Sequence, residues 1–222
     1  MNNKVIALMP MKGHSERVPN KNLRMFHGKP LYHHVLSTLQ SCQSIKKIII
    51  NTDSQEITAD IQANFNDIQI IERPDEISGD YVEMNKIISY DMSQVEGEYF
   101  IQTHSTNPLL KSRTIDDAID TYFRNILKYD SVFTVTKLMS RYYSKSGAPI
   151  NHSLNELIRT QDLPPIFEEN SNLYAFSRLS FKNAKNNRIG VNPKMYEVGK
   201  FESIDIDTLE DFLLAEAVMK FS

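Results

Sequence analysis

The sequence predicts an α/β protein with a mostly parallel central sheet and helices on both faces of that sheet. Short apolar runs alternate along the chain with segments whose apolar residues recur at helical spacing. Such alternation is typical of βαβ units joined by right-handed crossovers. The first run, Val5–Met9, is apolar throughout, as expected for a strand that is covered on both faces of a parallel sheet.

The first half of the chain is expected to alternate strands with two helices. Pro30 is well placed to start the first helix, because proline fits the first helical position. Ser54 is expected to cap the second helix, and Ile57 and Ile61 give that helix an apolar stripe. The strands expected in this half are Val5–Met9, Lys46–Thr52 and Ile68–Ile71.

The second half is expected to hold a helix at about 83–93, a helix that begins at Ser112 and a closing helix that contains Phe212. The strands expected here are Tyr99–Gln102, Ser131–Thr136, Leu173–Phe176 and Phe201–Ile206. The regular alternation lapses between Lys137 and Asn170, a stretch that contains one glycine and three prolines. We therefore expect one domain over residues 1–222, with an inserted excursion at about 137–170.

Composition excludes several classes of protein. The formal net charge of −3 gives no overall basic field for nucleic acid or an anionic membrane. The single cysteine, Cys42, excludes an internal disulfide framework and suits a reducing compartment. Neither a signal-peptide pattern nor an apolar run of about 18–20 residues, the length that spans a bilayer, is present. We expect a soluble, cytoplasmic protein.

The segment after the first strand, Met11–Asn22, is the first candidate site. It reads MKGHSERVPNKN and carries three cations, Lys12, Arg17 and Lys21. Loops at the carboxyl ends of parallel strands are where open α/β sheets bind ligands, and Gly13 would let the backbone approach an anion closely. This pattern indicates a loop that binds a nucleoside triphosphate. The alternative is a solvated turn with ordinary surface charges.

The second candidate site is the acidic pair Asp205 and Asp207. If Phe201–Ile206 is a strand that continues to Asp207, alternation places both carboxylates on one face. Two adjacent carboxylates repel each other unless a cation such as Mg²⁺ lies between them. For Asp207 a helix cap, with Glu210 three residues later, is an equal alternative. For Asp205 a metal is favoured over a structural partner.

Polar residues also follow the strand Tyr99–Gln102, namely Thr103, His104 and Ser105. Such residues at this sheet edge commonly line a site, although a satisfied turn is equally compatible. His14 and His104 lie in candidate loops, but no His or Cys cluster has zinc spacing. The chain lacks the G-x-G-x-x-G, P-loop and G-x-S-x-G motifs of other nucleotide-binding proteins and hydrolases.

Several motifs, in order along nearly the whole chain, resemble those of the sugar-acid cytidylyltransferases, and of the N-acylneuraminate (CMP-sialic acid, nonulosonic acid) cytidylyltransferases most closely. The first is the Met11–Asn22 loop, which is similar to the family signature R-G-G-S-K-R-I-P-x-K-N. The other matching segments are Asn51–Ser54, Arg73–Asp80, Gln102–Leu109, Arg159–Gln161, Asn170–Tyr174 and Ser203–Asp211.

The resemblance implies a Rossmann-like fold of the nucleotide-diphospho-sugar transferase type, and attack of a sugar-acid hydroxyl on the α-phosphate of CTP with release of pyrophosphate. The implied catalytic residues are Lys12, Arg17, Lys21, Asp205 and Asp207, of which the two aspartates would hold Mg²⁺. The residues implied for CTP are Lys12, Gly13, Ser15, Arg17, Lys21, Asn22, Ser78 and Asp80. Those implied for the sugar acid are Gln102, Ser105, Arg159, Gln161, Asn170 and Tyr174. The resemblance also implies a homodimer built through the inserted segment.

Departures from the family pattern leave alternatives open. Lys12 replaces an arginine, His14 a glycine, and Glu16 reverses the charge of a lysine. A different eight- or nine-carbon sugar acid is therefore a possible substrate, as for a Kdo-type cytidylyltransferase, and a nucleotide-binding homologue without catalysis is the remaining alternative.

Overall fold

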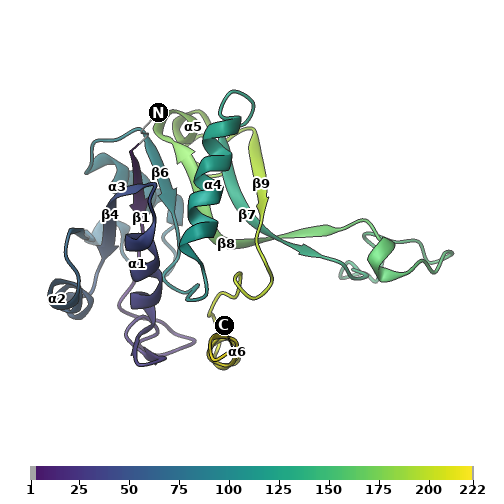
Figure 1. Cartoon of the computed structure of the whole chain (residues 1–222), viewed down its shortest axis with the longest axis horizontal. Helices are drawn as coiled ribbons and strands as arrows, with labels where there is room; N and C mark the ends of the chain where they lie inside the picture. The colour runs from purple at the N-terminus through teal and green to yellow at the C-terminus, as the bar shows by residue number, and fades with distance from the viewer. Residues whose placement is uncertain (1–3, 222) are drawn as a thin grey trace.

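The computed structural model describes residues 4–221, and within that range seven strands form one sheet in the order β5-β4-β1-β6-β8-β7-β9 (Figure 1). Strand β8 runs antiparallel to β6 and β7, whereas the other pairings are parallel. The predicted, mostly parallel sheet is confirmed. The strands are β1 Val5–Leu8, β4 Ile45–Thr52, β5 Ile68–Glu72, β6 Tyr99–Gln102, β7 Ser131–Leu138, β8 Ile166–Ser177 and β9 Pro193–Glu197.

Helices cover both faces of the sheet, as predicted. One apolar cluster joins the sheet to α1, α2 and α4, and a second joins the opposite face to α3 and α5. The helices are α1 Leu31–Ser41, α2 Gln55–Asn64, α3 Met84–Ser93, α4 Ser112–Asn125, α5 Arg178–Asn183 and α6 Leu209–Met219. Short 3-10 helices occur at Asp75–Ile77 and Thr160–Asp162, and β2 (Met25–Phe26) pairs with β3 (Lys29–Pro30) as a small hairpin.

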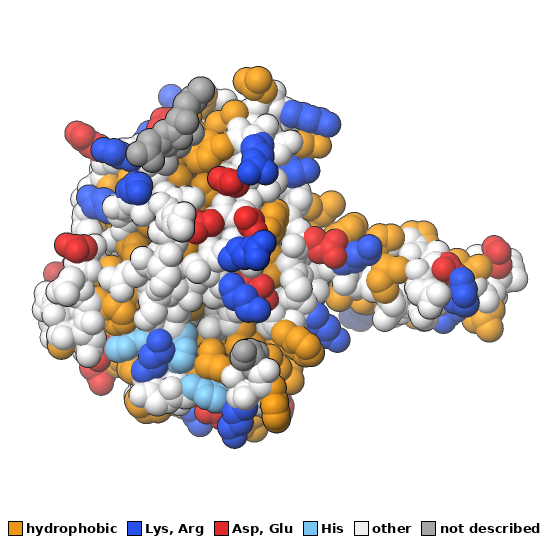
Figure 2. All heavy atoms as spheres, in the orientation of Figure 1, with side chains coloured by type: hydrophobic (Ala, Val, Ile, Leu, Met, Phe, Trp, Pro, Cys, Tyr) orange, Lys and Arg blue, Asp and Glu red, His pale blue; other side chains and the backbone are white. Residues whose placement is uncertain are grey.

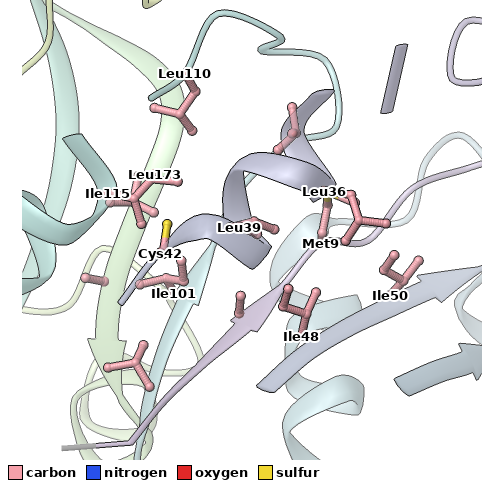
Figure 3. Close-up of a cluster of buried hydrophobic side chains, with 14 of the residues drawn as sticks. Met9, Leu36, Leu39, Cys42, Ile48, Ile50, Ile101, Leu110, Ile115 and Leu173 are labelled. Carbon is pink, nitrogen blue, oxygen red and sulfur yellow. The ribbon is translucent and has the colours of Figure 1, made fainter. Parts of the chain in front are cut away.

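The core explains why the first strand is apolar at every position. Val5 and Ala7 belong to the cluster on one face of the sheet, while Ile6 and Leu8 belong to the cluster on the other. Figure 3 shows the first cluster, in which Leu36 and Leu39 of α1 lie over the strands. Because β1 is central and covered on both sides, the loop that leaves it starts from a rigid base.

Several elements differ from the sequence prediction. Strand β8 begins at Ile166 rather than at Leu173, so it includes the last residues of the excursion expected at about 137–170, and the β2–β3 hairpin was not predicted. Phe201–Ile206 is not a strand: it is a turn followed by an extended segment, in which Ile206 is buried against Phe26 and Phe212 instead of pairing in the sheet. The edge strand β9 was not predicted, because its residues are largely exposed or half-buried and lack an apolar face. Helix α5, only six residues long, was also missed.

An arm projects from the sheet between β7 and β8. These strands pair antiparallel out to Leu138 and Ile166, and the intervening residues extend away from the sheet, to the right in Figure 1. Figure 2 shows hydrophobic and charged side chains intermixed on the surface of this arm. Ile150, Leu154 and Leu157 are 60%, 70% and 90% exposed there.

Candidate active site

A cavity of about 490 Å³ lies at the carboxyl ends of the parallel strands. It is bordered by the loop after β1, the loop after β5, the loop after β6 and the segment before α6, so it collects residues from both ends of the chain. The volume is within the range of small-molecule sites. Residues of both candidate sites, the basic loop and the acidic pair, line this one cavity.

The basic loop and the acidic pair are in direct contact. Arg17 Nη2 lies 2.9 Å and Lys21 Nζ 3.2 Å from Asp207 Oδ1, and Lys21 Nζ also donates to the carbonyl of Ile206 at 2.6 Å. Across the cavity, Lys12 Nζ pairs with Asp80 Oδ1 at 2.7 Å. Each of the three cations therefore has an acidic partner. The Lys21 side chain is largely buried, whereas the other side chains of these pairs are more than a third exposed. A polyanion could replace these carboxylates as the partner of the cations.

The Met11–Asn22 loop is held by contacts below the cavity. The N–H of Gly13 donates to Asp53 Oδ1 at 2.7 Å, and a Cβ at position 13 would lie only 2.7 Å from Cβ of Ser54. Gly13 is thus needed for close packing against the start of α2, and its N–H is not free to bind an anion. Asn22 ties two loops together, since its side chain donates to the carbonyl of Lys12 and accepts from the hydroxyl of Ser105.

A buried polar cluster supports the same loop from the other side. The guanidinium of Arg73, a residue only 5% exposed, donates to the side chain of Asn51 at 2.6 Å and to the carbonyl of Met11 at 3.1 Å. Asn51 in turn donates to Asp91 Oδ1 at 2.5 Å. Burial raises the pKa of Asp91 to about 7, against the opposing effects of the Asn51 hydrogen bond and the Arg73 charge. Of this cluster, sequence reasoning noted only Arg73 and Asn51, as parts of motifs, and missed Asp91.

The acidic pair is arranged differently from the prediction. Asp205 and Asp207 lie in the irregular segment before α6, and Asp207 is not the cap of that helix. Thr208 caps it instead, in a reciprocal box with Asp211, which leaves Asp207 facing Arg17 and Lys21.

Asp205 has a feature that fits a bound cation. Its Oδ1 is buried and has no hydrogen-bond partner among residues 4–221. Burial raises the pKa of the carboxyl group, a hydrogen bond from the side chain of Thr106 opposes this effect, and the charge of Asp207 adds to it. An orphaned carboxylate oxygen beside a second carboxylate suits Mg²⁺, which usually takes one or two protein carboxylates and completes its shell with phosphate oxygens and water. The described residues form no group of three or more acidic, His or Cys side chains that could hold a metal on their own.

The remaining predicted residues divide between the cavity and its surroundings. Ser15, Asp80 and Ser105 line the cavity. Ser78 does not line it, and its hydroxyl bonds to the carbonyl of Pro74. Three residues assigned to the sugar acid, Gln102, Asn170 and Tyr174, are buried and do not line the cavity.

Arg159 and Gln161 lie in the arm, where Arg159 pairs with Asp162 at 2.7 Å. They do not line the cavity of their own chain.

Two further residues, His104 and Arg188, complete the description of the site. His104 lines the cavity, and burial, reinforced by the charge of Arg188, lowers its pKa to about 4, so the imidazole is neutral at pH 7. Arg188, from the loop between α5 and β9, donates to Gln102 Oε1 at 2.7 Å. Arg188 was not predicted, because it lies in an irregular polar segment and its contacts are far away in sequence.

Parallel strands whose carboxyl ends surround one cavity are the arrangement in which open α/β proteins bind their ligands, and the cations and carboxylates here suit a phosphorylated ligand. A sequence model of the family described as Cytidylyltransferase matches residues 6–219, so the chain belongs to the cytidylyltransferase family. The family resemblance predicted from the motifs is confirmed.

Relatives of known name are distant. The chain is 26% identical over 223 residues to an N-acylneuraminate cytidylyltransferase of Streptococcus agalactiae serotype V, a match that covers 95% of this chain and 52% of that protein. It is 24% identical over 233 residues to a CMP-N,N'-diacetyllegionaminic acid synthase of Legionella pneumophila, covering 99% of this chain and 97% of that protein. The chain thus spans about half the length of the streptococcal relatives it matches.

Among solved structures, the chain is similar to a CMP:2-keto-3-deoxy-manno-octonic acid synthetase in complex with CTP. The TM-score is 0.74, with 17% identity and 99% of both chains covered. At that identity the likeness supports the fold alone. Within residues 4–221, no helix is both long and apolar enough to cross a membrane.

Proposed function

We propose that this chain transfers the cytidylyl group of CTP to a sugar acid and releases pyrophosphate. The observation that carries the proposal is the single cavity in which Lys12, Arg17 and Lys21 face Asp205 and Asp207. In this reaction a sugar hydroxyl oxygen bonds to the α-phosphorus, the bond to the bridging oxygen of the β-phosphate breaks, and the hydroxyl proton is released. The relatives named as N-acylneuraminate and legionaminic acid enzymes support a nine-carbon sugar acid.

The three cations would act by neutralising charge. Pyrophosphate carries several negative charges as it departs, and fixed cations aimed at that charge lower the barrier without reorganising. Arg17 and Lys21 would exchange Asp207, and Lys12 would exchange Asp80, for phosphate oxygens. Asn22 fixes the loop backbone from which these side chains project.

Asp205 and Asp207 would hold Mg²⁺ together with the phosphates of CTP. When bound, the ion supplies positive charge at the reacting phosphate. The orphaned oxygen of Asp205 supports this assignment. Asp207 contacts both Arg17 and Lys21, which places the acidic pair next to the cations that would receive the phosphates.

The arm supports a homodimer in which each chain contributes to its partner's cavity. Its exposed side chains Ile150, Leu154 and Leu157 offer apolar surface for a second copy. Arg159 and Gln161, which do not line the cavity of their own chain, would then act on the sugar acid bound by the partner. We place the reaction in the cytoplasm, where the unpaired, buried Cys42 is stable.

The proposal is tested by measuring pyrophosphate release from the purified chain with Mg²⁺. Each of CTP, UTP, ATP and GTP is combined with N-acetylneuraminic, N,N'-diacetyllegionaminic, pseudaminic and 2-keto-3-deoxy-manno-octonic acids. We expect release with CTP and at least one nine-carbon acid. Turnover with the octonic acid alone would assign a Kdo-type enzyme, and tight CTP binding without turnover across the panel would favour a nucleotide-binding protein without catalysis.

A further inference from the structure

Arg188 is a cation without an anionic partner. Its guanidinium carbon lies 3.8 Å from the centre of the Tyr174 ring, and Nη1 donates to Gln102 Oε1 at 2.7 Å. Among residues 4–221, no carboxylate lies within ion-pair distance of it, and its other guanidinium donors have no acceptor. Lys12, Arg17 and Lys21, by contrast, all have carboxylate partners. A half-buried guanidinium that lacks a counter-ion is suited to bind an anion from outside the chain.

Arg188 lies beside the cavity wall. Its backbone N–H donates to the side chain of Asn85 at 3.4 Å, and two other residues of the same helix α3, Met84 and Ile87, line the cavity. Its charge also acts on His104, which lines the same cavity. Arg188 is not itself among the residues that line the cavity. Its guanidinium bonds Gln102, which stands two residues before His104 in the chain, so the guanidinium lies next to the part of the cavity wall that His104 forms.

The buried residues beneath Arg188 hold it in one orientation. Gln102 is fully buried, and both ends of its amide are used, since Nε2 donates to the carbonyl of Thr103 while Oε1 accepts from Arg188. Tyr174 is also fully buried, and its hydroxyl bonds to Glu169. Neither side chain is free to bind a substrate directly. Together they form a platform that presents the planar guanidinium.

We propose that Arg188 binds the carboxylate of the sugar acid. This inference rests on the proposed function, because it assigns one group of that substrate. A planar guanidinium can hold a carboxylate through two parallel hydrogen bonds, which fixes the orientation of the sugar as well as its charge. The three loop cations are left for the triphosphate, so each anionic part of the two substrates meets its own cations.

The test compares Arg188→Met, Arg188→Lys and the matched surface control Arg113→Met, whose side chain is 91% exposed on α4. The substrate is the acid of the panel that wild-type protein turns over fastest. We expect Arg188→Met to raise KM for the acid about 10- to 100-fold, as for loss of a charge-assisted hydrogen-bonded pair. KM for CTP should change less than about twofold, as for uniform loss of one substrate's binding. Arg188→Lys, which keeps the charge but not the fork, should lie between.

A neutral substrate supplies the second arm. Wild-type protein should use the methyl ester of the same acid with a KM about as high as that of Arg188→Met for the free acid, and the variant should no longer distinguish acid from ester. An unchanged KM for the acid in Arg188→Met would overturn the proposal, and so would equal use of acid and ester by wild type. The proposal would also be overturned if Arg159→Met, and not Arg188→Met, abolished the preference for the free acid over its methyl ester.

Folding and the parent proposal are controlled separately. CTP binding and thermal melting of each variant establish whether the fold is intact. If Arg188→Met does not fold, the proposal is tested by Arg188→Lys and by the comparison of acid and ester with wild-type protein. Wild-type protein that turns over no acid contradicts the proposed function itself, and the assignment of Arg188 falls with it. Active wild type with an indifferent Arg188→Met contradicts only the assignment of Arg188.

Discussion

The buried carboxyl group of Asp91 should make the stability of the protein depend on pH in a defined way. Its folded pKa is about 7, whereas an unfolded aspartate titrates near 3.9. Between these values the folded chain holds one more proton than the unfolded chain, so the free energy of unfolding falls as pH rises. The full difference of about three pKa units corresponds to about 4 kcal/mol, and roughly 3 kcal/mol of it lies between pH 5 and pH 8.

Asp91→Asn removes this titration while keeping an oxygen that accepts the hydrogen bond of Asn51. Urea unfolding at pH 5 and pH 8 should therefore show that the variant gains about 3 kcal/mol relative to wild type as the pH is raised. Asp117→Asn, an exposed change on α4, is the matched control and should follow the wild-type profile. Parallel pH profiles for Asp91→Asn and wild type would refute the reasoning.

Two further changes test the loop that carries the cations. Gly13→Ala places a Cβ 2.7 Å from Ser54 and should destabilise the protein by about 1–3 kcal/mol and weaken CTP binding, whereas unchanged melting and CTP titration would contradict the close packing. Lys21→Met removes a cation that bonds both the Ile206 carbonyl and Asp207, so KM for CTP should rise about 10- to 100-fold, and the melting temperature should fall because two hydrogen bonds are lost; a normal KM for CTP would rule out its phosphate role.

The strands of the core could be predicted from the sequence because their burial determines their composition. In β1, both faces are covered, so every residue is apolar and the pattern is unambiguous. Strand β9 lies at the sheet edge with its side chains half-exposed, and its composition does not differ from that of a loop. The segment Phe201–Ile206, by contrast, has the composition of a strand without being one. Ile204 and Ile206 alternate with polar residues as in a strand, but they pack on α6 and the β2–β3 hairpin rather than on the sheet.

The cations and the acidic pair could be predicted because they lie in short motifs with a recognisable order. The groups that hold them could not, since their partners are distant in sequence. Arg73 bonds Met11 across 62 residues, and Arg188 bonds Gln102 across 86. Of the two alternatives for Asp207, the helix cap is wrong, since Thr208 caps α6. The sequence could not separate the two residues, because Asp207 with Glu210 and Thr208 with Asp211 fit similar capping patterns.

The central claim is that the acidic pair before α6 and the cations after β1 serve one reaction in one cavity. The most direct test is CTP-dependent pyrophosphate release by Asp205→Ala, compared with wild type and with Glu96→Ala, an exposed carboxylate remote from the cavity. We predict that Asp205→Ala loses at least about 100-fold in kcat, as for removal of a group that stabilises transition-state charge, while Glu96→Ala retains wild-type turnover. Full turnover by Asp205→Ala would contradict the account.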